Sequence, residues 1–176
     1  MPLQREARLR ALVDAHLDTV WRALKRLGVP DAGADDATQE VFIVAARRLD
    51  EIEPGRERGY LLGIALRVAA DARRALRRRG EVPLDEAGDV VLAGSGQAAG
   101  AAEAALDQQR ARMALAAVLA RMPDELREAF VLFEIEELTA PEAAAALGIP
   151  VGTIASRVRR AREFVRAHVP RKEGTP

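Results

Sequence analysis

A segment near the carboxyl end of the chain combines an apolar helical face with side chains that bond nucleic acid. Ile154, Val158, Ala161 and Val165 recur at helical spacing and define a buried face. Arginine bonds guanine edges bidentately, and serine or threonine bonds bases or phosphates, so the other face predicts DNA binding. By position, Thr153, Ser156, Arg157 and Arg160 suit base edges, and Arg159, Arg162 and Arg166 suit phosphates.

The residues before this segment predict how it is positioned. Thr139 and Glu142 form a capping box, and Pro141 fits the first turn of the short helix that they begin. Gly148 ends that helix, and the next runs from about Val151 to His168. Two helices joined by a tight turn predict a helix-turn-helix whose second helix enters the major groove. The alternative is a solvated amphipathic helix that closes a bundle.

The charges of the chain are segregated although its formal net charge is zero. Six arginines against one aspartate occupy residues 67–79, and seven cations against one glutamate occupy residues 157–172. Residues 81–107 hold six acids and neither lysine nor arginine. Two basic patches with an acidic spacer indicate two contacts with polyanions. Arginines that only solvate helix faces are the alternative explanation.

The composition predicts an all-α fold of two small helical domains. Aromatic residues make up only 3% of the chain, and alanine and leucine dominate its apolar positions. Apolar spacing predicts helices over about 5–27, from about 31, and over about 58–79, so the first domain covers residues 1–79. Residues 80–103, rich in glycine, alanine and acids, predict a flexible linker, and residues 104–170 form the second domain.

Other features of the sequence limit the class of protein. The chain has no cysteine, which fits a reducing compartment, and its charged start is unlike a signal peptide. No apolar run has the length of a membrane span, so we expect a cytoplasmic protein with no membrane insertion. Asp35, Asp36 and Glu40 could hold a metal, but no histidine, nucleophile or phosphate loop accompanies them. We therefore expect no enzyme activity, no metal site and no cofactor.

The second domain carries a resemblance to a known family. Met122-Pro123-Asp124-Glu125-Leu126-Arg127-Glu128-Ala129 through Arg162 resembles region 4 of extracytoplasmic-function (ECF) sigma factors of the sigma-70 family. Their pattern reads LP.E.RE, followed by L(S/T)..E.A..LGIPVGTV.SR..RAR. The resemblance implies an RNA polymerase specificity subunit whose region 4 docks on the β flap and reads the −35 element of promoter DNA.

The first domain resembles region 2 of the same family. Asp35-Asp36-Ala37-Thr38-Gln39-Glu40-Val41-Phe42 is similar to its (A/E)DL.QE.F helix, and Tyr60-Leu61-Leu62-Gly63-Ile64-Ala65 to its WL..IA helix. The resemblance implies docking on the β′ clamp helices of RNA polymerase core through Asp36, Gln39, Glu40 and Phe42. Asp35 is instead expected to stabilise the start of its helix.

In this family, region 2 also helps to melt the −10 element, and the loop before its third helix holds an unstacked base. Cations and aromatic rings hold single-stranded DNA. The candidates here are Arg56, Arg58, Tyr60, Arg67, Arg73, Arg74 and Arg77. Tyr60 replaces the usual tryptophan, and Arg67-Val68 replaces a common arginine-asparagine pair. Ala155 replaces a common lysine in the recognition helix, and Ala140-Pro141 a tyrosine-glutamate pair; these departures favour altered promoter preference.

The linker fits this interpretation. The two promoter elements lie about two helical turns apart, roughly 70 Å. A chain of about 24 residues has an extended length of roughly 80 Å. It could therefore bridge the two elements, and its acids could follow the basic channels of the polymerase.

Three functions are compatible with the sequence. The leading hypothesis is an ECF sigma factor that directs polymerase core to promoters and has an anti-sigma factor as a partner. A free-standing helix-turn-helix regulator is the second, and it leaves the resemblance of the first domain unexplained. The third is a degenerate sigma-like interaction protein that initiates nothing. The amino-acid sequence does not identify the promoter, the regulon or the inducing signal.

Overall fold

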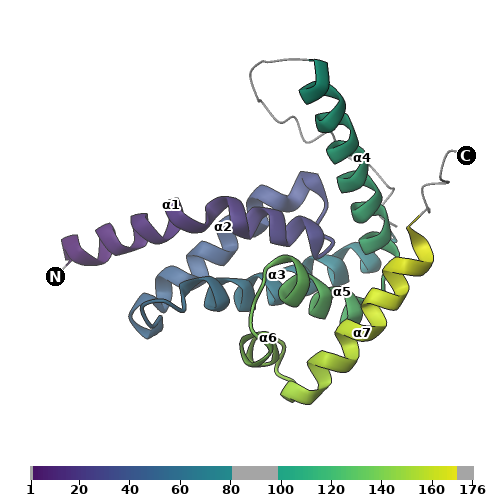
Figure 1. Ribbon diagram of the computed structural model, residues 1–176. Coiled ribbons are helices and arrows are strands. Elements are labelled where there is room, and N and C mark those ends of the chain that lie inside the picture. The colour runs from purple at the N-terminus through teal and green to yellow at the C-terminus, as the bar shows by residue number, and fades with distance from the viewer. Residues whose placement is uncertain (1, 81–98, 170–176) are drawn as a thin grey trace, which may run out of the picture.

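The computed structural model describes residues 2–80 and 99–169, and their regular structure is helical throughout (Figure 1). The prediction of an all-α fold is therefore confirmed. The first domain contains α1 (Pro2–Arg26), α2 (Asp31–Arg47), the short 3₁₀ helix η1 (Leu49–Glu51) and α3 (Glu57–Arg79). The second contains α4 (Ala99–Arg121), α5 (Asp124–Phe130), the π-helical turn η2 (Val131–Ile135), α6 (Ala140–Leu147) and α7 (Val151–His168).

In the first domain, α1, α2 and α3 pack against one another around side chains that are almost fully buried, among them Val20, Leu24, Val41 and Leu61. The turn after α1 depends on Gly28, whose φ of +92° is unfavourable for other residues. The Val29 N–H donates to the Leu24 carbonyl, which closes the end of the helix. This turn reverses the chain so that α2 folds back on α1.

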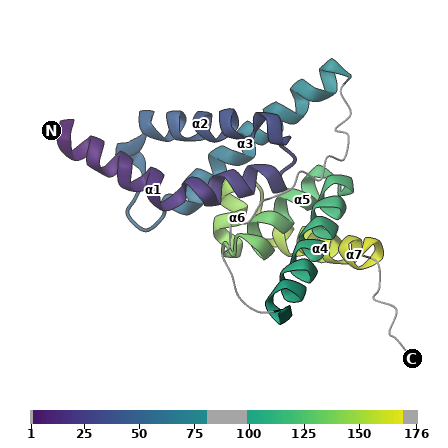
Figure 2. The ribbon, with the colours of Figure 1, turned by 90° about the horizontal axis from the view of Figure 1, so that it is seen from above.

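In the second domain, α7 packs on both α5 and α6. The last turns of α4 contribute Val118 and Leu119 to the core, whereas Leu106 and Met113 are about half exposed. Figures 1 and 2 both show the start of α4 projecting from the packed helices. The helix begins at Ala99, so residues 99–103, which we expected in the linker, are helical. The rest of the predicted linker, apart from Gly80, lies outside the described residues.

The helix α3 joins the two domains into one packed body. An unbroken run from Leu61 to Leu66 is buried on it, which is typical of a helix covered on more than one side. Here α1 and α2 cover one side of α3, and α6 covers another (Figure 2). A Cβ added to Gly63 would lie 3.8 Å from the Ala146 Cβ. The buried side chains of both domains form a single hydrophobic cluster.

Candidate nucleic-acid interface

The helix α7 has the two faces that its sequence predicts. Ile154, Val158 and Ala161 are at most 3% exposed and Val165 is half-buried, which confirms the core face. Ser156, Arg159, Arg160 and Arg162 are exposed, and Thr153 and Arg157 are half-buried. No side chain caps the start of α7, and a Cβ added to Gly152 would meet no atom within 4 Å. The Thr153 N–H bonds the Pro150 carbonyl, and the rest of this uncapped first turn, next to the exposed Ser156 hydroxyl and cations, suits phosphate oxygens.

The predicted capping box and the predicted terminal glycine hold the two ends of α6. The Thr139 N–H donates to Glu142 Oε2 (2.9 Å), and the Glu142 N–H donates to Thr139 Oγ1 (3.4 Å), which confirms the capping box. The Thr139 hydroxyl also donates to Glu142 Oε2 (2.6 Å), and this bond, together with the one from the Thr139 N–H, lowers the pKa of the Glu142 carboxyl. At the other end Gly148 has a φ of +66°, and the Ile149 N–H donates to the Ala144 carbonyl (3.0 Å). The turn that sets the direction of α7 is therefore closed by local hydrogen bonds.

Acidic side chains pair with most of the cations on α7. Arg157 lies 3.0 Å from a Glu125 oxygen, and Arg162 donates twice to Glu134 Oε1. Arg159 pairs with Glu163 one turn later on the same helix. No described residue forms an ion pair with Arg160. Arg166 is likewise exposed with no ion pair to a described residue, so Arg160, near the start of the helix, and Arg166, near its end, can bind DNA without first leaving a partner.

The structure separates the arginines expected at the −10 element into two groups. Arg67 is exposed, as are Arg56 and Arg74, which form ion pairs with Glu53 and Asp71 close by in the sequence. Arg58, Arg73 and Arg77 instead pair with acids of the second domain. Arg73 is only 7% exposed and donates to the Leu27 carbonyl and to Glu128, so DNA cannot reach it in this arrangement. Tyr60 is half-buried and packs against the core.

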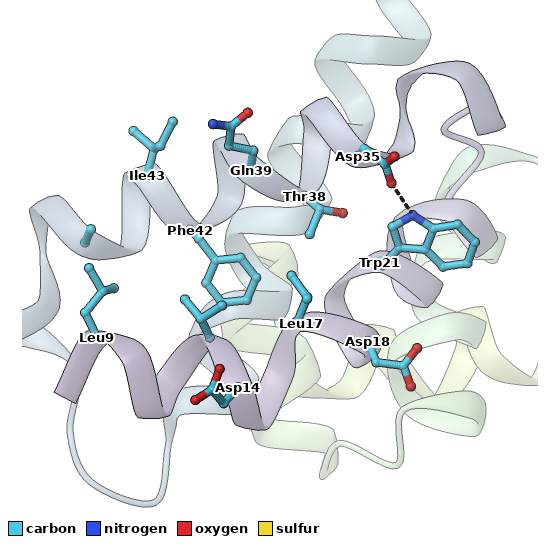
Figure 3. Close-up of a pocket in the computed structure, with 12 residues that line it drawn as sticks. Leu9, Asp14, Leu17, Asp18, Trp21, Asp35, Thr38, Gln39, Phe42 and Ile43 are labelled. Carbon is cyan, nitrogen blue, oxygen red and sulfur yellow. Dashed lines mark hydrogen bonds between the residues drawn. The ribbon is translucent and has the colours of Figure 1, made fainter. Parts of the chain in front are cut away.

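A groove of about 770 Å³ runs between α1 and α2 (Figure 3). Its floor is apolar, and Leu17 and Ile43 are almost half exposed. Asp14, Asp18 and Asp35 lie along it. Among the residues expected at the polymerase interface, Gln39 and Phe42 line the groove, with Phe42 largely buried, and Asp36 and Glu40 are exposed on α2.

One expectation about this region needs correction. The helix α2 begins at Asp31, so Asp35 lies beyond its first turn and is not the carboxylate that stabilises the helix start. Its Oδ1 instead accepts a hydrogen bond from Trp21 Nε1 at 2.9 Å (Figure 3). Trp21 is half-buried and lines the groove. The indole N–H needs a polar partner, which explains why the ring lies at the edge of the core.

Sequence reasoning missed the polar residues between the domains. Glu136 is 3% exposed, and its oxygens lie 2.7 Å from Arg26 Nη1 and 3.0 Å from Arg58 Nη2. The π-helical turn η2 places it there, with the Glu136 N–H bonded to the carbonyl of Val131. A π turn has no recognisable sequence signal, and these partners are 110 and 78 residues away.

A capped helix-turn-helix beside a second, arginine-rich helical domain is typical of a DNA-binding protein that acts in transcription. Family models for Sigma-70 region 2 and Sigma-70 region 4 match residues 12–79 and 112–165. The chain belongs to the ECF sigma factors of the sigma-70 family, which are not enzymes but initiate transcription from particular promoters as subunits of RNA polymerase. The resemblance of both domains is thereby confirmed.

The curated relatives agree with this assignment. The chain is 34% identical to ECF RNA polymerase sigma factor SigE of Mycolicibacterium smegmatis, over 90% of this chain but only 60% of SigE. It is 34% identical to RNA polymerase sigma factor CnrH of Cupriavidus metallidurans, over 86% of this chain and 81% of CnrH. The ECF RNA polymerase sigma-E factor of Escherichia coli is 32% identical, over 78% of this chain and 74% of that protein.

Solved structures share the fold. CnrH in complex with the cytosolic domain of CnrY is 28% identical, with a TM-score of 0.62 over 90% of this chain and 85% of that one. The sigma factor RpoE in complex with the anti-sigma factor NepR from Bartonella quintana has a TM-score of 0.66 at 24% identity, over 93% of this chain and 98% of that one. In this chain, no helix among the described residues is long and apolar enough to cross a membrane.

Proposed function

We propose that the first domain docks on RNA polymerase core and holds the melted −10 element, while the second domain reads the −35 element. The observation that carries this proposal is the exposed face of α7, where Ser156 and Arg160 project beside an uncapped helix start. A recognition helix meets base edges with the side chains of its first turns. Arg56, Arg67 and Arg74 are the exposed cations of the first domain that we assign to the −10 strand.

The groove between α1 and α2 is our candidate for docking on the β′ clamp helices. Its exposed apolar side chains would be covered by a partner helix, and the acids along it favour a partner with basic residues. Gln39 and Phe42 line the groove, and Asp36 and Glu40 lie exposed beside it on α2. The β flap would receive the second domain. The protein would then act in the cytoplasm, where transcription takes place.

An anti-sigma factor is the other partner that we propose. RpoE, a neighbour in fold, was solved with the anti-sigma factor NepR, and CnrH was solved with the cytosolic domain of CnrY. The same groove offers such a partner an apolar surface that polymerase also needs. Competition for one surface would be sufficient to keep the sigma factor inactive.

Run-off transcription with purified polymerase core tests the proposed function. The expected result is a set of discrete transcripts from genomic templates that appear only when this chain is added to core. The absence of any promoter-dependent transcript, together with retained binding to core, would favour the degenerate interaction protein. Sequence-specific DNA binding without polymerase would favour the free-standing regulator.

A further inference from the structure

A small cleft of about 200 Å³ opens beside the first turns of α7, between that helix, η2 and the start of α6. Ile154 and Val158 line it and are at most 3% exposed, whereas Ala155, which also lines it, is exposed. The rest of the lining consists of Phe133 on η2, Ala140 on α6 and Arg162 on α7. Among the described residues that line the cleft, all but Arg162 are apolar.

The cleft borders the part of α7 that a recognition helix presents to base edges. Val151 and Ala155 lie one turn apart on the same side of the helix, and Val151 is 49% exposed. The exposed Arg159 lies one turn beyond Ala155, and the exposed Ser156 follows it directly. Because the first turns of such a helix meet the bases, this apolar edge and the polar side chains face the same surface of DNA.

The charge of Arg162 does not make the cleft a site for anions. Arg162 donates from Nε (3.0 Å) and from Nη2 (2.5 Å) to Glu134 Oε1. Both bonds draw the guanidinium toward η2, where the Glu134 carboxylate offsets its charge. The stem of Arg162 therefore forms one wall of the cleft, and the space inside stays apolar.

Two positions at which the chain departs from the family pattern meet in this cleft. Ala155 stands where a lysine is common, and Ala140 stands where a tyrosine is common. Both alanines line the cleft, although they lie on different helices. A side chain that ends at Cβ leaves open the space that a longer one would fill, so the two departures act together.

We propose that this cleft binds the C5 methyl group of a thymine in the −35 element, with Ala155 as the residue that determines the preference. Among the groups that distinguish base pairs in the major groove, the thymine methyl is the apolar one, and alanine and phenylalanine side chains suit contact with it. Arg160 and Ser156 remain the polar readers on the adjoining face. The inference rests on the proposed function, because it requires α7 to lie in the major groove of the −35 element.

Replacement of single thymines by deoxyuridine tests the proposal, because only the methyl group is lost. The chain bound to polymerase core first selects templates by transcription from a promoter library that is randomised over the −35 element. We expect the selected elements to share a thymine at one position. Deoxyuridine at that position should weaken binding of the holoenzyme about fourfold, the factor expected for one methyl-sized group returned to water. Deoxyuridine at the other thymines of the element should have no such effect.

Two matched variants separate the cleft from a general effect of charge. Ala155→Lys puts a long side chain at an exposed helical position, where lysine is well tolerated, and should abolish the difference between thymine and deoxyuridine while binding persists. Ala167→Lys adds the same charge at an exposed position near the end of α7 and should retain the fourfold difference.

Equal binding of thymine and deoxyuridine at every position of the −35 element overturns the inference, and would leave the cleft to a side chain of a protein partner. A difference that persists in Ala155→Lys overturns it as well, because the methyl group would then be bound elsewhere. Either result would leave the proposed function intact as long as transcription still depends on the −35 sequence. A holoenzyme that is indifferent to the whole element would overturn both.

Discussion

At the scale of single residues, the structure distinguishes cations that are free to bind DNA from cations that already have partners. Arg160 is exposed and no described residue pairs with it, whereas Arg157 is held by Glu125 and Arg162 by Glu134. An arginine that must first break an ion pair gains less free energy when it binds DNA. The contribution of each arginine to −35 recognition therefore depends on its neighbours as well as on its position along α7.

Arg160→Ala is expected to weaken transcription from a −35-dependent promoter by about 10- to 100-fold, because a bidentate contact with a base is worth roughly 1–3 kcal/mol. Run-off transcription at several salt concentrations measures this, with core binding followed separately. Arg159→Ala is the control on the same helix: loss of a phosphate contact should weaken binding uniformly across sequences and reduce its salt dependence. Equal loss of core binding in Arg160→Ala would show a structural role instead.

The hydrogen bonds between Thr139 and Glu142 predict a pH dependence of stability. Because they lower the pKa of Glu142 in the folded chain, its stabilisation is complete above the ordinary value of 4.5 and is lost as the pH falls through the folded value. Thr139→Ala should lower the free energy of unfolding by about 1 kcal/mol at pH 7. In Glu142→Gln the free energy of unfolding should fall less steeply as the pH is lowered. Urea unfolding at pH 7 and in mild acid measures both effects. If Glu142→Gln loses as much stability in acid as the unchanged chain, Glu142 is not the group responsible.

At the scale of elements, local signals in the sequence were sufficient for most of the helices. The apolar spacing of α7 and the capping box and terminal glycine of α6 act within one or two turns, so the sequence alone predicts them. The burial of Arg73 and the position of Glu136 arise from contacts between distant segments and from a π turn. Composition placed Arg73 among the DNA-binding cations, because charge alone carries no information about partners brought close by folding.

The turn between α1 and α2 gives a prediction with a matched control. In Gly28→Ala the alanine would have to adopt the positive φ of the glycine. Its Cβ would lie 2.5 Å from Arg127 Nη1. Gly55 also has a positive φ, of +85°, but a Cβ there meets nothing within 4 Å. Both substitutions should destabilise the chain by about 1 kcal/mol through the backbone, and Gly28→Ala by more because of the contact. Thermal unfolding of the two variants measures the difference, and equal losses would show that Arg127 moves aside freely.

At the scale of the whole molecule, the groove and the contact between the domains use different surfaces. Every residue that lines the groove belongs to α1 or α2, whereas the ion pairs between the domains come from α3 and the end of α1. A partner can therefore occupy the groove without displacing the contact between the domains.

Ile43→Asp tests the groove as the docking surface. Ile43 is 46% exposed at the groove, so an aspartate there should leave the fold intact but place a charge against an apolar partner. We expect affinity for polymerase core to fall about tenfold or more, with the far-ultraviolet circular dichroism of the free chain unchanged. Leu3→Asp, at an exposed apolar residue outside the groove, is the control and should bind core normally. If Ile43→Asp binds core as well as that control does, polymerase docks elsewhere.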